Sequence, residues 1–162
     1  KAAGIEDEDT IRKMCVLANA VVFTSGGTTF MLAGEEMLRN KQGDSNSYMS
    51  SDEINQLDYS LKIKNADVFE NYQKLIAFKK KTTALHLDAP SVDVEFLDNN
   101  AVIVCRFVSD GSQYIVIHAN GGVTSASVNC EGYAIILDTL GTASVNGGSV
   151  SPDKYQTLIL KK

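Results

Sequence analysis

The sequence predicts two unlike halves: a helix–strand–helix step of α/β type over residues 1–83 and an all-β antiparallel sandwich over residues 84–162. The first half is predicted by two long segments with apolar residues at helical spacing and a short β-prone run between them. The second half is predicted by short β-prone segments at intervals of about ten residues, separated by turns rich in Asn and Gly. The chain has 162 residues, enough for one domain or two small ones, with a boundary expected near Thr83–Ala89.

The first expected element is a helix whose first turn carries the acidic run Asp7–Asp9 and which ends at Ser25–Gly27. Carboxylates in a first turn stabilise the positive end of the helix dipole, and glycine commonly ends a helix. Its apolar stripe is wide, so the helix should be buried against more than one neighbour. Residues 1–5 are expected to be frayed.

Three further segments complete the first half. Thr28–Ala33 is an apolar run bounded by glycines, which is typical of a buried parallel strand. Residues 35–65 form a polar loop that is too long for a simple connector, so we expect it to be functional. Asn65 should cap a second helix from about Ala66 to Lys81. The expected buried face of that helix consists of Val68, Phe69, Tyr72, Leu75 and Ile76.

The second half is expected to consist of short strands joined by tight turns. The expected strands are Val92–Leu97, Ala101–Val108, Gln113–His118, Ser125–Asn129, Tyr133–Asp138, Ala143–Val145 and Tyr155–Leu160.

Charge and hydropathy exclude two classes of partner. The net charge of −5 and the pI near 5.0 argue against a nucleic-acid binder, which would carry a basic patch or stripe. The sequence also lacks an apolar run of about 18 residues or more, as a membrane span needs. The chain begins at Lys1 rather than Met, which fits a processed or excised piece.

The cysteines and histidines show no ligand spacing, so neither a metal nor a cofactor is predicted. Cys15 lies in an apolar helical run and should be a small buried hydrophobe. Cys105 and Cys130 could pair if their strands are neighbours. His86 and His118 are each expected to be a hydrogen-bonded linker or strand residue.

The polar loop holds the candidate binding residues. Asp44, Asn46 and Tyr48 offer a carboxylate, an amide and an aromatic face, which carbohydrate recognition uses, although an Asx-turn loop without a ligand would have the same composition. A calcium loop is disfavoured because Met49 and Asn55 stand where glycine and glutamate would be needed.

The adjacent acids Glu35 and Glu36 are not a catalytic pair. Neighbouring side chains point apart, whereas glycosidic cleavage needs two carboxyl groups on either side of one bond. We expect these glutamates to orient the loop or to pair with a cation such as Arg39.

The run Gly34–Arg39 followed by Lys41–Tyr48 resembles the phrase that follows the eighth barrel strand of type I pullulanases, in the α-amylase superfamily of glycoside hydrolases. The resemblance covers residues 7–83 by motif and the remainder by order and composition. It implies that residues 1–83 are the last helix–strand–helix portion of a (β/α)8 barrel and that residues 84–162 are a C-terminal β-sandwich. Departures from the phrase include Gly26, Thr28–Thr29 and Leu32.

Residue by residue, the resemblance implies that Asn46 and Tyr48 line glucosyl subsites, while Asp44 and Asn55 shape the loop. The implied parent is a retaining debranching hydrolase that cleaves α-1,6-glucosidic bonds in pullulan, glycogen or starch dextrins. Its three catalytic carboxylates, one of them in a His-Asp-Asn motif, would lie upstream. That motif is absent here, so we expect no catalytic residue in this chain and no activity from it alone.

Two alternatives stay open: a non-catalytic α-glucan-binding or structural module, and a fragment of an amylase or isoamylase relative. A barrel remnant would also expose apolar faces that favour self-association. For the parent, a secreted, periplasmic or cell-surface location is favoured over the cytoplasm, with the compartment itself left open.

Overall fold

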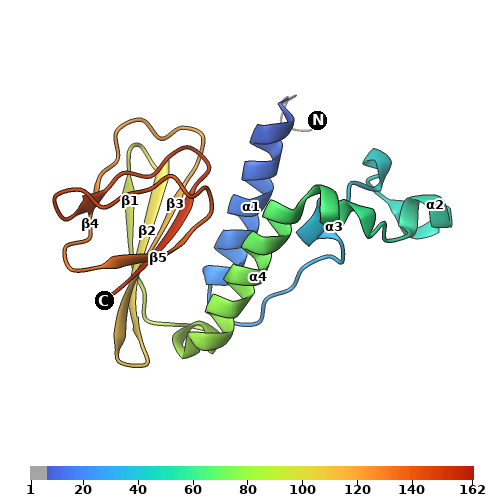
Figure 1. The fold of residues 1–162 in the computed structure, drawn as a ribbon. Coiled ribbons are helices and arrows are strands. Elements are labelled where there is room, and N and C mark those ends of the chain that lie inside the picture. The colour runs from blue at the N-terminus through green and yellow to red at the C-terminus, as the bar shows by residue number, and fades with distance from the viewer. Residues whose placement is uncertain (1–6) are drawn as a thin grey trace.

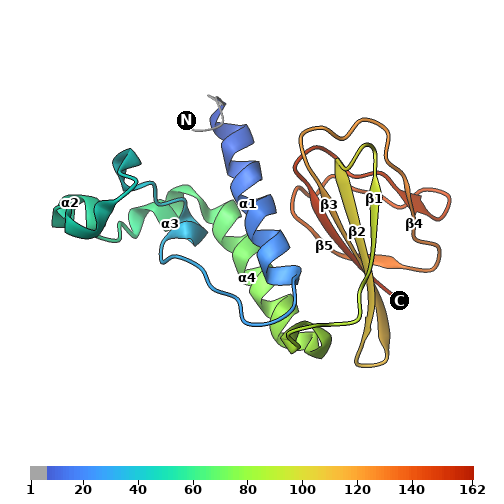
Figure 2. The same ribbon diagram turned by 180° about the vertical axis from the view of Figure 1, so that it is seen from behind.

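The computed structural model describes residues 7–162 and places a helical part against one face of an antiparallel sheet (Figure 1). Helices α1 (Glu8–Thr24) and α4 (Ala66–Lys81) lie side by side between the sheet and the polar segment that joins them. Figure 2 shows the same order of layers from behind. The expected fraying of residues 1–5 lies outside the described residues. A helical part followed by an antiparallel sheet is the order that the sequence predicts.

Helix α1 forms as predicted. The Asp7 carboxylate accepts a hydrogen bond from the Thr10 backbone N–H at 2.9 Å, and the helix ends at Thr24 with Ser25 as its C-cap. Its buried residues are Val16, Ala20 and Phe23, and it packs against both α4 and the sheet.

Helix α4 also has the predicted bounds, but Asn65 does not cap it with its side chain. Of the predicted buried face, Val68, Tyr72 and Leu75 are buried, Phe69 is half-buried and Ile76 is exposed. The last turn carries Lys79–Lys81 at the negative end of the helix dipole, and the 3-10 turn η4 (Thr83–His86) leads from there to the sheet. The predicted domain boundary falls in this turn and stays a prediction.

The predicted strand Thr28–Ala33 is wrong for this chain, because these residues form neither helix nor strand. A parallel strand exists only when a neighbouring strand bonds to its backbone, and none of the described strands lies beside this segment. The side chain of Phe30 is 89% exposed and that of Leu32 is 51% exposed, so the segment is not buried either.

The polar segment between the two long helices consists of short helical turns rather than a featureless loop. These turns are η1 (Glu35–Met37), η2 (Lys41–Gly43), η3 (Ser47–Met49), α2 (Asp52–Asn55) and α3 (Ser60–Lys64).

The second half forms one sheet and a smaller strand pair. The strands are β1 (Asp93–Leu97), β2 (Val102–Ser109), β3 (Ser112–Ala119), β4 (Val128–Asn129), β5 (Ala134–Asp138), β6 (Ser149–Val150) and β7 (Thr157–Lys161). The sheet has the order β1-β2-β3-β7-β5 with antiparallel neighbours throughout, and β4 pairs with β6. The second layer of the predicted sandwich is therefore only this strand pair and its loops.

One predicted strand is absent and another is shortened where carboxylates bind the backbone N–H groups that a strand would need. Ala143–Val145 is not a strand, and the Ala143 N–H donates to Asp138 at 2.9 Å. Strand β4 starts later than predicted, because the Ser125 N–H donates to Asp98 at 3.1 Å. Side chains that bind nearby backbone in this way compete with sheet formation.

The central strands of the sheet are covered on both faces. Alternate residues face opposite sides, so Ile115, Ile117 and Leu160 pack toward β4 and β6, while Val116 and Ile159 pack toward the helices. The second cluster joins residues of α1 and α4 to residues of the sheet, so the helical part and the sheet share one apolar interface.

The cysteines are all free, so the conditional pairing of Cys105 with Cys130 does not occur. Cys105 lies beside the cluster under the helices, whereas Cys130 belongs to the cluster on the opposite face of the sheet. Cys15 is half-buried rather than buried.

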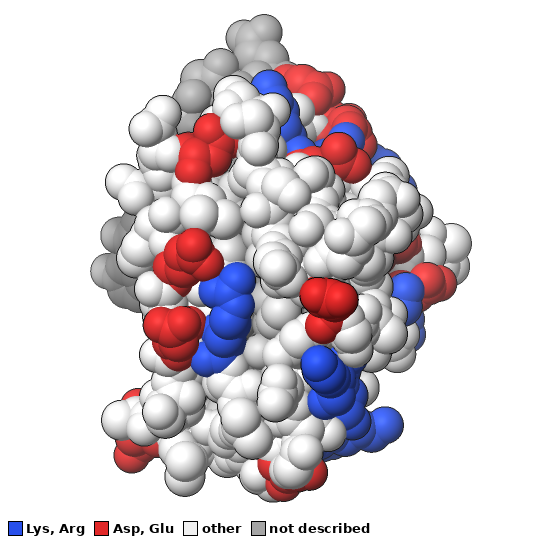
Figure 3. Space-filling model, turned by 90° about the vertical axis from the view of Figure 1, so that its left-hand side faces the viewer, with Lys and Arg blue, Asp and Glu red and all other residues white. Residues whose placement is uncertain are grey.

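The surface over the sheet side carries Lys and Arg in a few separate groups among acidic and uncharged residues (Figure 3). None of the helices in residues 7–162 is both long and apolar enough to cross a lipid bilayer.

Candidate functional site

The candidate loop contains a turn that is closed by one carboxylate. Asp44 accepts a hydrogen bond from the Asn46 backbone N–H at 2.9 Å and another from the Ser50 hydroxyl. The Ser50 hydroxyl, then the Asn46 amide and the charge of Lys41, hold the pKa of Asp44 below its ordinary value. The ionised carboxylate therefore fixes the turn between residues 44 and 50.

A second brace crosses the same turn from α2. The Asn55 side-chain amide donates to the Ser47 carbonyl at 2.7 Å and to the Ser50 carbonyl at 3.0 Å. The Lys41 ammonium donates to the Ser47 hydroxyl at 2.6 Å, and Ser47 is buried. Two side-chain donors therefore converge on the middle of the turn.

We call residues 44–50 the braced turn, and this turn presents its remaining side chains to solvent. Asn46 is exposed, and Tyr48 and Met49 are each 80% exposed. The predicted residues thus separate into two kinds: Asp44 and Asn55 bond within the loop, whereas Asn46 and Tyr48 are accessible. An accessible amide and aromatic ring can bind sugar hydroxyls and cover an apolar sugar face.

The base of the loop is a tight bend at Gly34. Its φ of +98° lies in the left-handed region, and its N–H donates to the Glu36 carboxylate at 2.9 Å. Arg39 donates to the Ala33 carbonyl at 3.3 Å and to the Asn55 carbonyl. Glu36 therefore orients the loop, and Arg39 binds carbonyl groups instead of the expected glutamates.

Backbone conformation sets this bend apart from the rest of the helical part. Leu38, Lys41 and Gln42 all have positive φ, between 48° and 58°. Such angles are uncommon for residues other than glycine and cluster at functional sites.

A polar hollow of about 340 Å³ lies beside the braced turn. It is lined by Arg39, Asn40, Lys41, Gln42, Glu53, Ile54, Gln56, Asp58 and Leu61. None of the four predicted binding residues lines it. No sequence pattern groups these residues, because the short helical turns that bring them together have no periodicity. One signal was available, since Arg39, Lys41 and Gln42 belong to the loop phrase.

The two histidines are hydrogen-bonded, as predicted. His86 Nε2 is 2.9 Å from the Lys79 carbonyl oxygen. His118 is buried between Thr24 and Thr157, and burial lowers its pKa to about 4. Within the described part of the chain, no three His, Cys, Asp or Glu side chains gather as a metal site would require.

No family model matches the chain. In sequence it is similar to the pullulanase of Bacillus subtilis (strain 168), with 35% identity over 82 residues, which is 51% of this chain and 11% of that protein. In structure it is similar to a pullulanase from Bacillus acidopullulyticus, with a TM-score of 0.82, 30% identity, and coverage of 97% of this chain and 21% of that one.

A pullulanase from Anoxybacillus sp. LM18-11, solved with maltotetraose, has a TM-score of 0.84 and 25% identity. The match covers 97% of this chain and 24% of that one. The chain therefore spans about a tenth of the curated relative and less than a quarter of these two solved structures.

Proposed function

The chain is related in sequence and in structure to the C-terminal portion of pullulanases, and from this premise we propose that it forms one wall of an α-glucan site. The proposed parent is a debranching glycoside hydrolase that cleaves α-1,6-glucosidic bonds by a retaining mechanism. In this proposal Asn46 and Tyr48 contact glucosyl units, and Asp44 and Asn55 hold the turn that carries them.

The observation that carries the proposal is the separation of roles within the turn. The Asp44 carboxylate and the Asn55 side-chain nitrogen are engaged inside the loop, so the shape of the turn does not depend on a ligand. Tyr48 projects from this fixed support with 80% of its surface accessible. Preorganised aromatic and amide groups lose little conformational entropy when a sugar binds.

The order of elements in the helical part supports the proposal that it is the end of a barrel. Helix α1, the segment Thr28–Ala33 and helix α4 follow one another as in the last portion of a (β/α)8 barrel. The exposed Phe30 and Leu32 would then be covered by strands that the rest of a barrel supplies. In this proposal residues 84–162 are the C-terminal domain of the same enzyme.

The chain alone should be inactive. Retaining cleavage uses two carboxyl groups about 5–5.5 Å apart on either side of the glycosidic bond. Glu35 and Glu36 are neighbours on one 3-10 turn, and Glu36 is bonded to the Gly34 N–H. An intact-mass-verified sample should release no reducing sugar from pullulan, and measurable hydrolysis would overturn this part of the proposal.

Binding can be tested separately from catalysis. A titration of ¹⁵N-labelled chain with maltotetraose should shift amide resonances of residues 44–55, whereas β-linked cellotetraose should not. Tyr48→Ala should weaken the shifts. Tyr59→Ala is the matched control, because Tyr59 is also an exposed tyrosine, at 68%, outside the braced turn. Equal shifts with both sugars, or equal effects of both variants, would refute the proposed site.

A non-catalytic α-glucan-binding module is the second candidate. It is favoured by the interface shared between the helices and the sheet, which gives this chain a core of its own. Such a module would bind maltotetraose as a stable monomer. A barrel remnant should instead self-associate through Phe30 and Leu32, which light scattering coupled to gel filtration would detect.

A further inference from the structure

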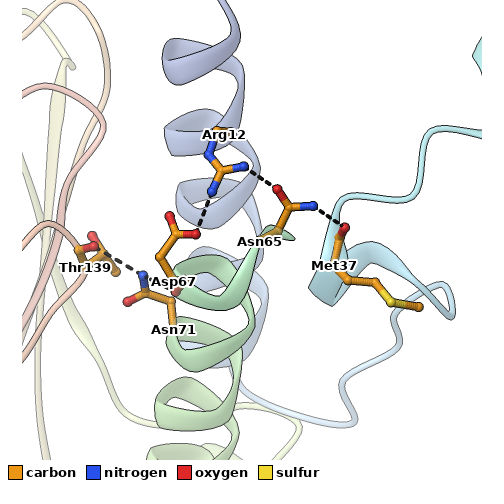
Figure 4. Close-up of polar contacts among 6 residues, drawn as sticks. All are labelled: Arg12, Met37, Asn65, Asp67, Asn71 and Thr139. Atoms are coloured by element: carbon orange, nitrogen blue, oxygen red, sulfur yellow. Dashed lines mark hydrogen bonds and ion pairs between the residues drawn. The ribbon is translucent and has the colours of Figure 1, made fainter. Parts of the chain in front are cut away.

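Asn65 occupies the N-cap position of α4 but uses its side chain elsewhere (Figure 4). The residue is 4% exposed. Its Nδ2 donates to the Met37 carbonyl at 2.9 Å, and its Oδ1 accepts a hydrogen bond from Arg12 Nη1. Both ends of the buried amide are therefore satisfied by groups outside its own helix.

This arrangement forgoes a common source of helix stability. Asparagine is among the preferred N-cap residues, and a capping hydrogen bond contributes about 1 kcal/mol. The backbone N–H groups in the first turn of α4 donate no hydrogen bond to this side chain. The amide instead connects the start of α4 to the base of the candidate loop.

Arg12 holds the amide from the other side. One guanidinium nitrogen donates to Asn65, and the other donates to the Asp67 carboxylate at 2.5 Å. The planar guanidinium has its donors in a fixed fork, so it can fix two neighbouring acceptors at once. Arg12 lies on α1, so the contact joins three segments: α1, the start of α4 and the loop base.

The Met37 carbonyl lies directly before the part of the loop with unusual backbone angles. Met37 is 1% exposed and ends η1, directly before Leu38, whose φ is +58°. The positive φ angles at Leu38, Lys41 and Gln42 therefore begin one residue after a carbonyl that Asn65 holds. Met37 thus lies between the packed helices α1 and α4 and the braced turn.

We infer that Asn65 is a positioning residue for the candidate glucan-binding turn and that Arg12 orients it. In this inference Asn65 does not contact the glucan. It sets the direction in which residues 38–50 leave the packed helices α1 and α4. The inference rests on the proposed function, because it assumes that this turn binds α-glucan.

The test uses the whole chain and two readouts: affinity for maltotetraose and amide hydrogen exchange of residues 38–50. Asn65→Ala should weaken maltotetraose binding by roughly three- to tenfold, the equivalent of one hydrogen bond, and should speed exchange in these residues. Arg12→Lys keeps the charge but loses the fork, so it should show the same changes to a smaller extent.

Asn71→Ala is the matched control. Asn71 is also on α4, and its side-chain amide donates to a carbonyl of another segment, that of Thr139 at 3.3 Å (Figure 4). This variant loses a similar bond on the side toward the sheet. It should leave both the affinity and the exchange of residues 38–50 unchanged.

The outcomes separate the two proposals. If the unaltered chain does not bind maltotetraose, the proposed function fails, while the exchange measurement still tests whether Asn65 orders the turn. If the chain binds maltotetraose and Asn65→Ala changes neither affinity nor exchange, the inference is wrong. Equal effects of Asn65→Ala and Asn71→Ala on both readouts would also overturn it, since they would indicate a general loss of stability.

Discussion

His118 on β3 is hydrogen-bonded to Thr24 in the last turn of α1, with 3.0 Å between the ring Nε2 and the hydroxyl oxygen. The other ring nitrogen lies 2.9 Å from the Thr157 hydroxyl on β7. One buried imidazole therefore connects the helical part to two strands of the sheet. The Thr24 hydroxyl donates to the Ala20 carbonyl at 2.8 Å, so it accepts from the Nε2–H of a neutral ring, and the Thr157 hydroxyl donates to Nδ1.

The first prediction is that stability falls as pH is lowered from about 6.5 to about 4, because burial depresses the pKa of His118 from 6.5 to about 4. In this window the unfolded state binds more protons than the folded state, so stability rises with pH. A shift of this size corresponds to a loss of up to about 3 kcal/mol at the acid end.

Urea unfolding of the chain and of His118→Gln at pH 7, 5.5 and 4.5 checks this prediction. The two stability curves should converge as the pH falls, because glutamine does not titrate. Parallel curves across this range would show that His118 is not the group responsible.

The second prediction concerns Tyr72, which is 1% exposed and whose hydroxyl has no hydrogen-bond partner within residues 7–162. Tyr72→Phe removes an unsatisfied polar group, so it should be neutral or stabilising by up to about 1 kcal/mol. Leu75→Ala, at a fully buried position on the same helix, should cost about 2–5 kcal/mol. Thermal unfolding measures both, and a large loss in Tyr72→Phe would reveal a partner for the hydroxyl.

The third prediction compares two glycines with left-handed backbone. Gly34→Ala places a Cβ 2.7 Å from the Arg39 Cδ at a φ of +98°, whereas Gly43→Ala has a φ of +83° with nothing within 4 Å. Both substitutions meet the conformational cost of about 1 kcal/mol for a side chain in this region. Only Gly34→Ala should add a steric cost and displace Arg39, giving the larger loss in denaturant unfolding. Equal losses would mean that the bend accommodates the methyl group.

The fourth prediction is that the helices and the sheet unfold together. Ile159 is fully buried in the cluster that joins α1 and α4 to the sheet, so Ile159→Ala should cost about 2–5 kcal/mol. Helical circular dichroism and the near-ultraviolet tyrosine signal should show coincident transitions before and after the substitution. Separate transitions for the two signals would instead support independent domains with the predicted boundary near residue 83.

The elements that the sequence predicts correctly are those with local causes. Helices α1 and α4 follow from apolar spacing, and most strands follow from alternating residues between Asn and Gly turns. Thr28–Ala33 fails because strand formation depends on a partner that this segment does not have. Ala143–Val145 fails because the Asp138 carboxylate binds the Ala143 backbone N–H, which residue preference alone does not predict.

The candidate site shows the same contrast between features with local causes and features that depend on distant contacts. The composition of the loop identifies Asp44, Asn46 and Tyr48, and the resemblance adds Asn55, but neither shows which of these side chains are engaged internally. Asn65 is predicted as a helix cap, and its actual partners are distant in sequence: Arg12 is 53 residues away and Met37 is 28. Contacts of that separation arise from packing of the helices, so a local pattern cannot reveal them.

The two-sided burial of the sheet has a consequence for the order in which the chain is made. Ribosomes deliver the N-terminal segments first. Helices α1 and α4 precede every described strand, so the apolar surface that covers Val116 and Ile159 is synthesised before those residues emerge. The strands can therefore assemble on an existing template, which shortens the time during which an uncovered sheet face could bind other nascent chains.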